Sequence, residues 1–204
     1  MSKVIPFPQA DSLEKVIRIA KIDDESYLKN NNIISSLLGN ITTRQVNYYL
    51  SAAEYLGLIN NRSFTKEGME YRSLYGNDQK VYLAYLLFRM PVFGQALANN
   101  VDLTGFMKIL KEFYPNMNDR MIKRRSQSGL AWIKYFNFKI IPAVSDGLLL
   151  SSKLASLAFF SEIIYGFETT EEDIEEMSKR YDCHQDSHNA WVEYKKLIDN
   201  SVKI

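Results

Sequence analysis

The chain has 204 residues, of which 46% are hydrophobic and 13% aromatic, and its 25 lysines and arginines nearly balance its 24 aspartates and glutamates. This composition excludes a disordered chain, and the length allows one large domain or two to three small ones. No apolar run approaches the roughly 18–20 residues of a membrane span, the first residues lack the apolar core of a signal peptide, and the single Cys183 cannot form an internal disulfide. We therefore expect a soluble, cytoplasmic protein without membrane contact.

The charges are unevenly distributed along the chain. Residues 1–76 hold nine basic and eight acidic residues, residues 77–137 hold nine and four, and residues 138–204 hold seven and twelve. A basic middle beside an acidic tail indicates separate tasks, and the basic middle is the better candidate for contact with phosphates.

Two short helices are predicted near the N-terminus. After a proline-marked lead, Ser12 has the position of an N-cap, and a helical apolar stripe follows. This stripe consists of Leu13, Val16, Ile17 and Ala20. The second helix is indicated by Ile33, Ile34, Leu37 and Leu38, and it ends at Gly39, a residue that commonly stops a helix.

The most informative stretch of the sequence is residues 40–68. Thr42 and Gln45 have the spacing of a capping box. The helix that they open buries the side formed by Val46, Leu50, Ala53 and Leu56. Gly57 ends this helix, Leu58-Ile59 is a short strand, a polar turn follows, and Phe64-Thr65-Lys66-Glu67-Gly68 begins a new helix.

Residues 10–75 resemble a winged-helix domain of the kind found in bacterial transcription regulators. The resemblance rests on three helices followed by YLGLI, a polar turn and SFTKEG. It implies that the third helix lies in the major groove of DNA and that the two-stranded wing touches the backbone.

The side of the third helix that lies opposite the apolar stripe carries the candidate base contacts. At about 100° per residue, Arg44, Tyr48, Ser51 and Tyr55 fall on this side. The residues that we expect to contact DNA here are Thr43, Arg44, Gln45, Asn47, Tyr48 and Ser51. Such side chains reach base edges and phosphates. Arg62 and Lys66 are candidate wing contacts to phosphate.

A second, looser copy of the pattern is predicted over residues 77–146. Helices are expected at 78–89, 91–99 and 103–113, and Asn118 caps a further helix. The inner side of that helix is formed by Ile122, Ser126, Gly129, Ile133 and Phe136. The outer side presents Arg120, Lys123, Arg124, Gln127 and Lys134, with Arg125 nearer the inside. These outer residues suit a duplex backbone, and a strand candidate follows at 138–142.

Residues 147–204 are predicted to form a helical C-terminal region. Leu148–Tyr165 is strongly apolar, Thr169 caps an acidic helix with Glu172 at capping-box spacing, and Trp191–Ile198 is an amphipathic helix. Because the first of these helices is apolar on many sides, we expect it to mediate self-association as a homodimer.

Neither a metal centre nor a catalytic site is predicted. Asp182, Cys183, His184, Asp186 and His188 are close in sequence, but such residues in a polar loop are more often unrelated to metal. Glu193-Tyr194-Lys195 fits a short nuclease motif, yet helical spacing around it places the Glu and the Lys on a solvated face. We expect no cofactor and no metal.

The sequence thus indicates a mainly α protein that has winged-helix modules with short β-wings and a helical C-terminal region. The domains expected are 1–76, 77–146 and 147–204. The function expected is sequence-preferring binding of double-stranded DNA, with transcriptional regulation as its use. One alternative is the recognition component of a type II restriction endonuclease, which tandem winged helices resemble. The other is a winged-helix module that binds proteins.

Overall fold

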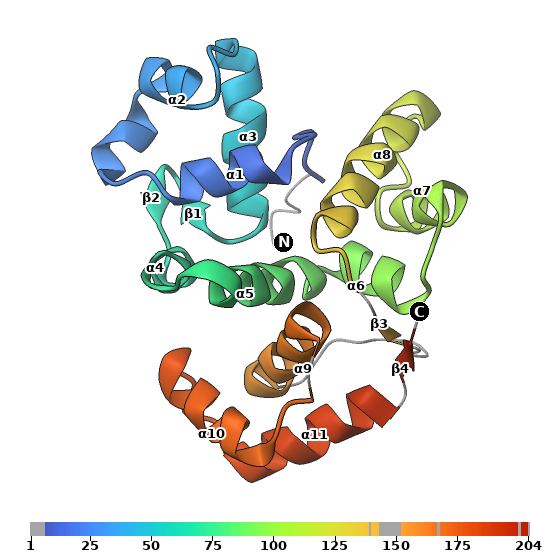
Figure 1. Cartoon of the computed structure of the whole chain (residues 1–204). Coiled ribbons are helices and arrows are strands. Elements are labelled where there is room, and N and C mark those ends of the chain that lie inside the picture. The colour runs from blue at the N-terminus through green and yellow to red at the C-terminus, as the bar shows by residue number, and fades with distance from the viewer. Residues whose placement is uncertain (1–6, 139, 143–151, 167, 200, 204) are drawn as a thin grey trace. The chain divides into compact units, whose positions relative to one another are not determined.

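α-Helices make up most of the chain in the computed structural model, which describes residues 7–138, 140–142, 152–166, 168–199 and 201–203 (Figure 1). The prediction of a mainly helical protein is confirmed. The chain divides into two units: unit 1 is Met1–Leu74 with Met117–Tyr135, and unit 2 is Tyr75–Asn116 with Phe136–Ile204. This grouping differs from the three consecutive domains expected from the sequence, because the chain leaves unit 1 and returns to it.

From residue 7 on, unit 1 contains six helical segments and one β-hairpin. The helices are α1 (Leu13–Ala20), the 3-10 helix η1 (Glu25–Lys29), α2 (Asn31–Leu37), α3 (Thr43–Tyr55), α4 (Lys66–Ser73) and α8 (Asp119–Tyr135), and the strands are β1 (Ile59–Asn60) and β2 (Ser63–Phe64). α1 and α2 both pack against α3, and α1 also contacts α4 and α8.

The predicted caps of α1 and α3 are confirmed. The Ser12 side chain accepts a hydrogen bond from the backbone N–H of Lys15. Thr42 and Gln45 form the capping box, in which each side chain accepts a hydrogen bond from the backbone N–H of the other residue. These bonds satisfy amide groups that have no partner in the first turn of a helix.

The buried side of α3 is the predicted one, with one exception at its C-terminal end. Val46, Leu50, Ala53 and Leu56 are all buried. Tyr55, which we expected on the outer side, is also buried, and its ring packs edge to face on Phe7 at 5.7 Å. The residues before α1 cover this end of α3, and helical periodicity carries no information about a distant segment of the chain.

The stripe of α1 and the apolar side of α2 differ from the predictions in detail. Ile17 is partly exposed and Ile19 is buried in α1. In α2, Ile34 is buried, whereas Leu37 keeps 39% of its surface exposed. The expected stop at Gly39 has a φ of 91°, which glycine adopts without steric cost.

The β-hairpin of unit 1 is short and has a two-residue turn. β1 and β2 are antiparallel, with Ile59 opposite Phe64 and Asn60 opposite Ser63. The turn residues Asn61 and Arg62 have positive φ values of 48° and 63°, as a tight hairpin turn requires.

Thr65 and Gly68 are both required by the close contacts at the start of α4. The Thr65 hydroxyl donates to the Gly57 carbonyl and accepts from the Gly68 N–H at 2.9 Å, and the Thr65 N–H donates to the Leu58 carbonyl at 3.2 Å. A β-carbon on Gly68 would lie 1.9 Å from the Leu58 carbonyl oxygen. Only glycine therefore lets α4 pass so close to the residue that precedes β1.

α8 packs in unit 1, although we expected it in a second winged-helix-like domain. Asn118 accepts from the backbone N–H of Met121 at 2.9 Å, which confirms it as the cap. The buried residues of α8 are Ile122, Arg125, Ser126, Gly129 and Trp132. The inner position of Arg125 was expected, but Ile133 is only partly buried, whereas Trp132 is buried.

The described residues of unit 2 form six helices and a two-stranded sheet. These are α5 (Gly76–Phe88), α6 (Pro91–Ala98), α7 (Leu103–Phe113), α9 (Lys153–Tyr165), α10 (Glu171–Arg180), α11 (Ser187–Asp199), β3 (Ile140–Pro142) and β4 (Ser201–Lys203). β3 is the strand expected at 138–142, but its antiparallel partner is β4 at the far end of the sequence. The expected turn Ser145–Gly147 lies outside the described residues.

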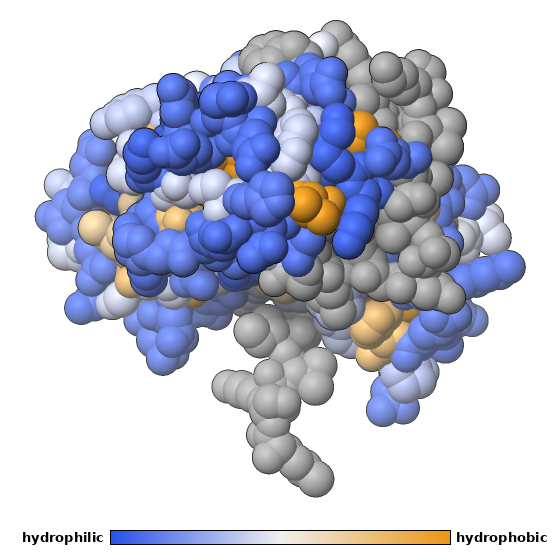
Figure 2. All heavy atoms as spheres, turned by 90° about the horizontal axis from the view of Figure 1, so that it is seen from below, coloured by the Kyte–Doolittle hydropathy of each residue, from blue (hydrophilic) through white to orange (hydrophobic). Residues whose placement is uncertain are grey.

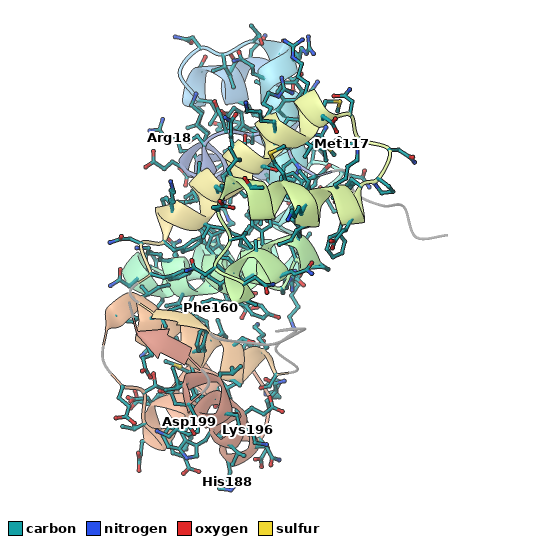
Figure 3. The ribbon with its side chains drawn as sticks, turned by 90° about the vertical axis from the view of Figure 1, so that its right-hand side faces the viewer. Arg18, Met117, Phe160, His188, Lys196 and Asp199 are labelled. Carbon is teal, nitrogen blue, oxygen red and sulfur yellow. The ribbon has the colours of Figure 1, made fainter. Side chains whose placement is uncertain are left out.

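α9 is the central helix of unit 2. Its residues from Leu154 to Ile163 are buried, and it packs against α5, α10 and α11. Phe160 (labelled in Figure 3) stacks on Phe88 at 5.5 Å and meets Phe159 edge to face at 5.3 Å. The described part of the apolar segment that we expected to mediate self-association is therefore mostly buried within the unit. Leu148–Leu150 lie outside the described residues.

The surface of unit 2 at α10 and α11 is polar. Figure 2 shows a mainly hydrophilic surface with small apolar spots, seen from the side at which α10 and α11 lie in Figure 1.

The N-terminal cap of α10 differs by one residue from the prediction. Thr170 and Asp173 form the capping box of α10 in place of Thr169 and Glu172. Thr169 is buried, and its hydroxyl donates to the Ala158 carbonyl at 3.4 Å, so its side chain is directed to α9 and Thr170 is the cap.

In the part of the chain that the structure describes, no single helix is long and apolar enough to span a membrane. α5 and α6 reach the required length and apolarity only when taken together, and they are bent by 101° at the break between them.

We predict that Gly68→Ala destabilises unit 1. The added methyl group collides with the Leu58 carbonyl, and overpacking of this kind costs about 1–3 kcal/mol, which outweighs the gain of about 1 kcal/mol in helix propensity. The free energy of unfolding of the full chain in urea measures the change. Met69→Ala is the control on the same helix, because Met69 is 57% exposed. Equal stability of the two variants would contradict the close approach.

Candidate nucleic-acid interface

One side of α3 is exposed and polar along its length. Thr43, Arg44, Asn47 and Ser51 are exposed, while the opposite side of the helix is buried in unit 1. The Arg44 Nε donates to the Tyr48 hydroxyl at 2.6 Å, and the guanidinium lies 5.7 Å from the centre of the Tyr48 ring. Arg44 is thus held against its own helix one turn on, with its remaining N–H donors at the surface.

Arg62 is held by contacts inside unit 1. Its guanidinium donates to the Leu28 carbonyl and to Asn31 Oδ1, each at 2.8 Å, and to Asn47 Oδ1 at 3.4 Å. These bonds tie the hairpin turn to η1, α2 and α3. Arg62 was expected to contact phosphate, but its structural contacts already account for an arginine at this position.

The other candidate wing residue, Lys66, is exposed as the first residue of α4. The nearby Arg72 has a structural position that the sequence analysis missed. Its guanidinium donates to the Ala20 carbonyl at 3.2 Å and to the Ile22 carbonyl, and it lies 4.2 Å from the centre of the Phe64 ring. Arg72 therefore caps the C-terminal end of α1 and joins it to β2.

The outer side of α8 presents a row of polar and basic side chains. The exposed residues of this row are Arg120, Lys123, Arg124, Gln127 and Lys134. With α8 included, unit 1 contains 14 basic and 9 acidic residues, a net charge of +5, whereas unit 2 contains 11 and 15, a net charge of −4. The basic residues expected in a second domain thus belong to the same unit as α3.

A groove of about 420 Å³ lies between α3 and α8 in unit 1. It is lined by Gln9, Ala10 and Asp11 before α1, by Gln45, Tyr48 and Tyr49 of α3, and by Arg124, Gln127, Ser128 and Ala131 of α8. The structure therefore brings together four residues that we predicted as separate contacts on two domains: Gln45 and Tyr48 from one helix, Arg124 and Gln127 from the other.

The segment before α1 forms part of this groove, and the sequence analysis missed its role. Gln9 Oε1 accepts a hydrogen bond from Arg124 at 2.7 Å, and Asp11 Oδ1 accepts one from the Tyr49 hydroxyl. Burial and the hydrogen bond to Asp11 raise the pKa of Tyr49 well above its usual 10, so Tyr49 stays protonated and remains the donor. An irregular segment has no periodicity, so the sequence carried no signal for these contacts.

Both histidines considered for a metal lie close to a carboxylate. Cys183 is buried, His184 lies 3.3 Å from Asp182, and His188 lies 2.9 Å from Glu171. Within the described residues, no group of three or more histidine, cysteine, aspartate or glutamate side chains is arranged to hold a metal ion.

The short nuclease motif lies on α11, as the helical spacing predicted. Tyr194 is buried, and Lys195 pairs with Glu168 at 2.9 Å and lies 5.0 Å from the centre of the Trp191 ring. Lys195 is thus engaged at the surface of unit 2 with groups that do not belong to the motif.

A protein-family model matches residues 15–140, which is more than half of the chain. The chain belongs to the family described as Domain of unknown function (DUF7226). The match runs from α1 through α8 to the start of β3, so this DUF7226 member carries both helices of the groove within the family region. No curated protein and no solved structure matches the chain.

We predict that Arg62→Gly destabilises unit 1 although glycine suits the positive φ at this position. The loss of hydrogen bonds from a charged group costs about 1.5–3 kcal/mol, whereas relief of the left-handed backbone returns about 1–2 kcal/mol. Asn61→Gly, the matched control in the same turn, is expected to be neutral or stabilising. The free energy of unfolding of both variants in urea measures these effects. An equal gain in both would show that the Arg62 guanidinium contributes nothing to stability and is available to a ligand.

A second prediction concerns His188, whose pKa Glu171 raises above the usual 6.5 through a hydrogen bond and its charge. The contribution of this pair to stability is present at low pH and is lost as pH rises through the pKa of His188 in the folded protein. Glu171→Gln should lower that pKa, as followed by an NMR titration of the imidazole protons. Glu172→Gln, which removes a neighbouring charge without the hydrogen bond, should lower it less. The reverse order would exclude the pairing.

Proposed function

We propose that the protein binds double-stranded DNA with a preference for sequence, through unit 1, and that it serves as a transcriptional regulator. In unit 1, the α-helices α1, α2 and α3, with the 3-10 helix η1 between the first two, precede a two-stranded hairpin, α4 follows the hairpin, and α8 comes later in the chain. Three helices, a hairpin and a helix are the order expected of a winged helix, and we propose that residues 13–73 of unit 1 form a winged-helix module with α3 as its recognition helix and the β1–β2 hairpin as its wing.

The observation that carries the proposal is the exposed polar side of α3. The helix has 13 residues and is therefore about 20 Å long, and the major groove admits a helix of this kind. Arg44 suits guanine, and the amide of Asn47 suits adenine. Thr43 and Ser51 lie on the same exposed side and can contact bases or phosphates. Because the other side of α3 is buried, this side can enter a groove without loss of packing.

The positive charge of unit 1 supports the same function. α8 adds Arg120, Lys123 and Lys134 at the surface, and each lysine or arginine that meets a phosphate releases counterions from DNA. The proposal requires only one copy of the chain. The homodimer expected from the sequence stays a prediction, and α9, the described part of the apolar segment, is enclosed in unit 2.

The role of α3 is tested by Arg44→Ala on a binding site selected from random duplexes. We expect a loss of about 1–3 kcal/mol on the preferred site and a relaxed preference at one base pair. Fluorescence anisotropy on matched and mismatched duplexes measures both effects. Arg18→Ala is the control, because it removes one exposed positive charge from α1 of the same unit. Unchanged affinity and preference in a folded Arg44→Ala variant would remove α3 as the reader.

The role of α8 is tested by replacing Arg120 and Lys123 together with glutamine. Contacts to phosphate carry no sequence information, so we expect affinity to fall equally for every duplex. The slope of log affinity against log salt concentration should flatten by about 0.9 for each lysine or arginine that no longer meets a phosphate. A weakening confined to the preferred site would instead assign these residues to base reading. Absence of DNA binding in the unmodified chain would overturn the proposed function itself.

A further inference from the structure

We propose that the groove between α3 and α8 binds one nucleotide, with the phosphate at Arg124 and the base against Tyr48. This site goes beyond the proposed function, because neither reading of the major groove by α3 nor contact of Arg120 and Lys123 with a duplex requires the groove to be filled. Its volume of about 420 Å³ lies within the range of about 300–1,000 Å³ that is typical of small-molecule sites.

The charges in the groove specify where the anionic part of a ligand lies. Arg124 is its basic residue, and Arg120 and Lys123 lie within one turn of it on α8. Asp11 lies in the segment before α1. A phosphate is therefore favoured on the α8 side and disfavoured near Asp11, whereas N–H donors of a ligand are favoured near Asp11.

The hydrogen bonds already formed in the groove show which donors and acceptors are left for a ligand. Arg124 donates to Gln9 Oε1, a neutral acceptor that a phosphate oxygen can replace with a gain in charge pairing. Gln45 uses its Oε1 as the acceptor in the capping box, which leaves its amide N–H group for a ligand. Gln127 contributes a whole amide to the lining. Amide side chains of this type pair with the edges of nucleobases.

The aromatic rings provide the surface for a planar group. Tyr48 and Tyr49 both line the groove, and base stacking on an aromatic side chain is tolerant of base identity. Tyr49 is fixed by its hydrogen bond to Asp11, whereas Tyr48 is partly exposed and accepts from Arg44. A ligand that combines one phosphate, one planar ring and N–H donors is a nucleotide. Its source is either a free mononucleotide or one nucleotide of a nucleic-acid strand.

The experiment titrates the full chain with dAMP, dGMP, dCMP and dTMP, with the corresponding nucleosides, with inorganic phosphate, and with a short single-stranded oligodeoxynucleotide. Calorimetry measures the affinities. We expect saturable binding of at least one mononucleotide that is tighter than binding of its nucleoside or of phosphate alone. Binding of the oligonucleotide without binding of any mononucleotide assigns the site to one nucleotide of a strand. No saturable binding of either overturns the proposal.

Three variants test the assigned contacts. Arg124→Gln should weaken nucleotide binding by roughly tenfold or more, as removal of a charged hydrogen bond does, without affecting the nucleoside. Tyr48→Ala should weaken both by roughly fivefold to a hundredfold, and Tyr48→Phe, which keeps the ring, should retain binding. Lys134→Gln removes the same charge from α8 outside the groove and should have little effect. An equal decrease for Arg124→Gln and Lys134→Gln overturns the site in favour of general charge attraction.

These outcomes are independent of the proposed function. Duplex binding that Arg44→Ala weakens, in a chain whose groove binds no nucleotide or oligonucleotide, leaves the function standing and overturns the groove site. Nucleotide binding in a chain that binds no duplex does the opposite. Circular dichroism of each variant shows whether a weaker affinity reflects an unfolded chain.

Discussion

The burial of one side of α3 determines where the functional side chains of unit 1 lie. Val46 and Leu50 are buried, α1 and α2 pack against α3, and the capping box at Thr42 fixes where the helix begins. Because the start and the inner side of α3 are fixed, the helical repeat of 3.6 residues per turn determines the direction of every other side chain on it. Arg44 and Ser51 must face outward, and Tyr48 must face the groove. The same helix therefore supplies both a side of the core and a polar outer surface.

Local signals in the sequence predicted the helices, whereas contacts between distant segments could not be predicted from it. The cap at Asn118 and the turn before Ser63 depend on residues within a few positions of each other, so they could be predicted directly. The packing of α8 in unit 1, the burial of Tyr55 under Phe7 and the pairing of β3 with β4 all join segments that are far apart. The groove belongs to this second class, because helical periodicity predicts which sides are polar but not which polar sides meet.

The arginines of unit 1 show why charge alone does not define an interface. Arg62 and Arg72 donate to backbone carbonyls of neighbouring elements, and Arg125 is buried in α8. Arg44 and Arg120 are exposed. The guanidinium group has five donors in a fixed fork, which suits carbonyl oxygens at helix ends as well as phosphate. The distinction between structural and binding arginines comes from the acceptors around each one, which the sequence does not give.

Tyr48 joins the two proposed sites, since it lines the groove and accepts the hydrogen bond from Arg44. A base stacked on the Tyr48 ring limits the positions open to its hydroxyl, and the hydroxyl in turn limits those open to the Arg44 guanidinium. If both sites are used, occupancy of the groove changes the cost of placing Arg44 against a base edge. Coupling of binding free energies is reciprocal, so a nucleotide that alters affinity for duplex DNA by some factor has its own affinity altered by DNA through the same factor.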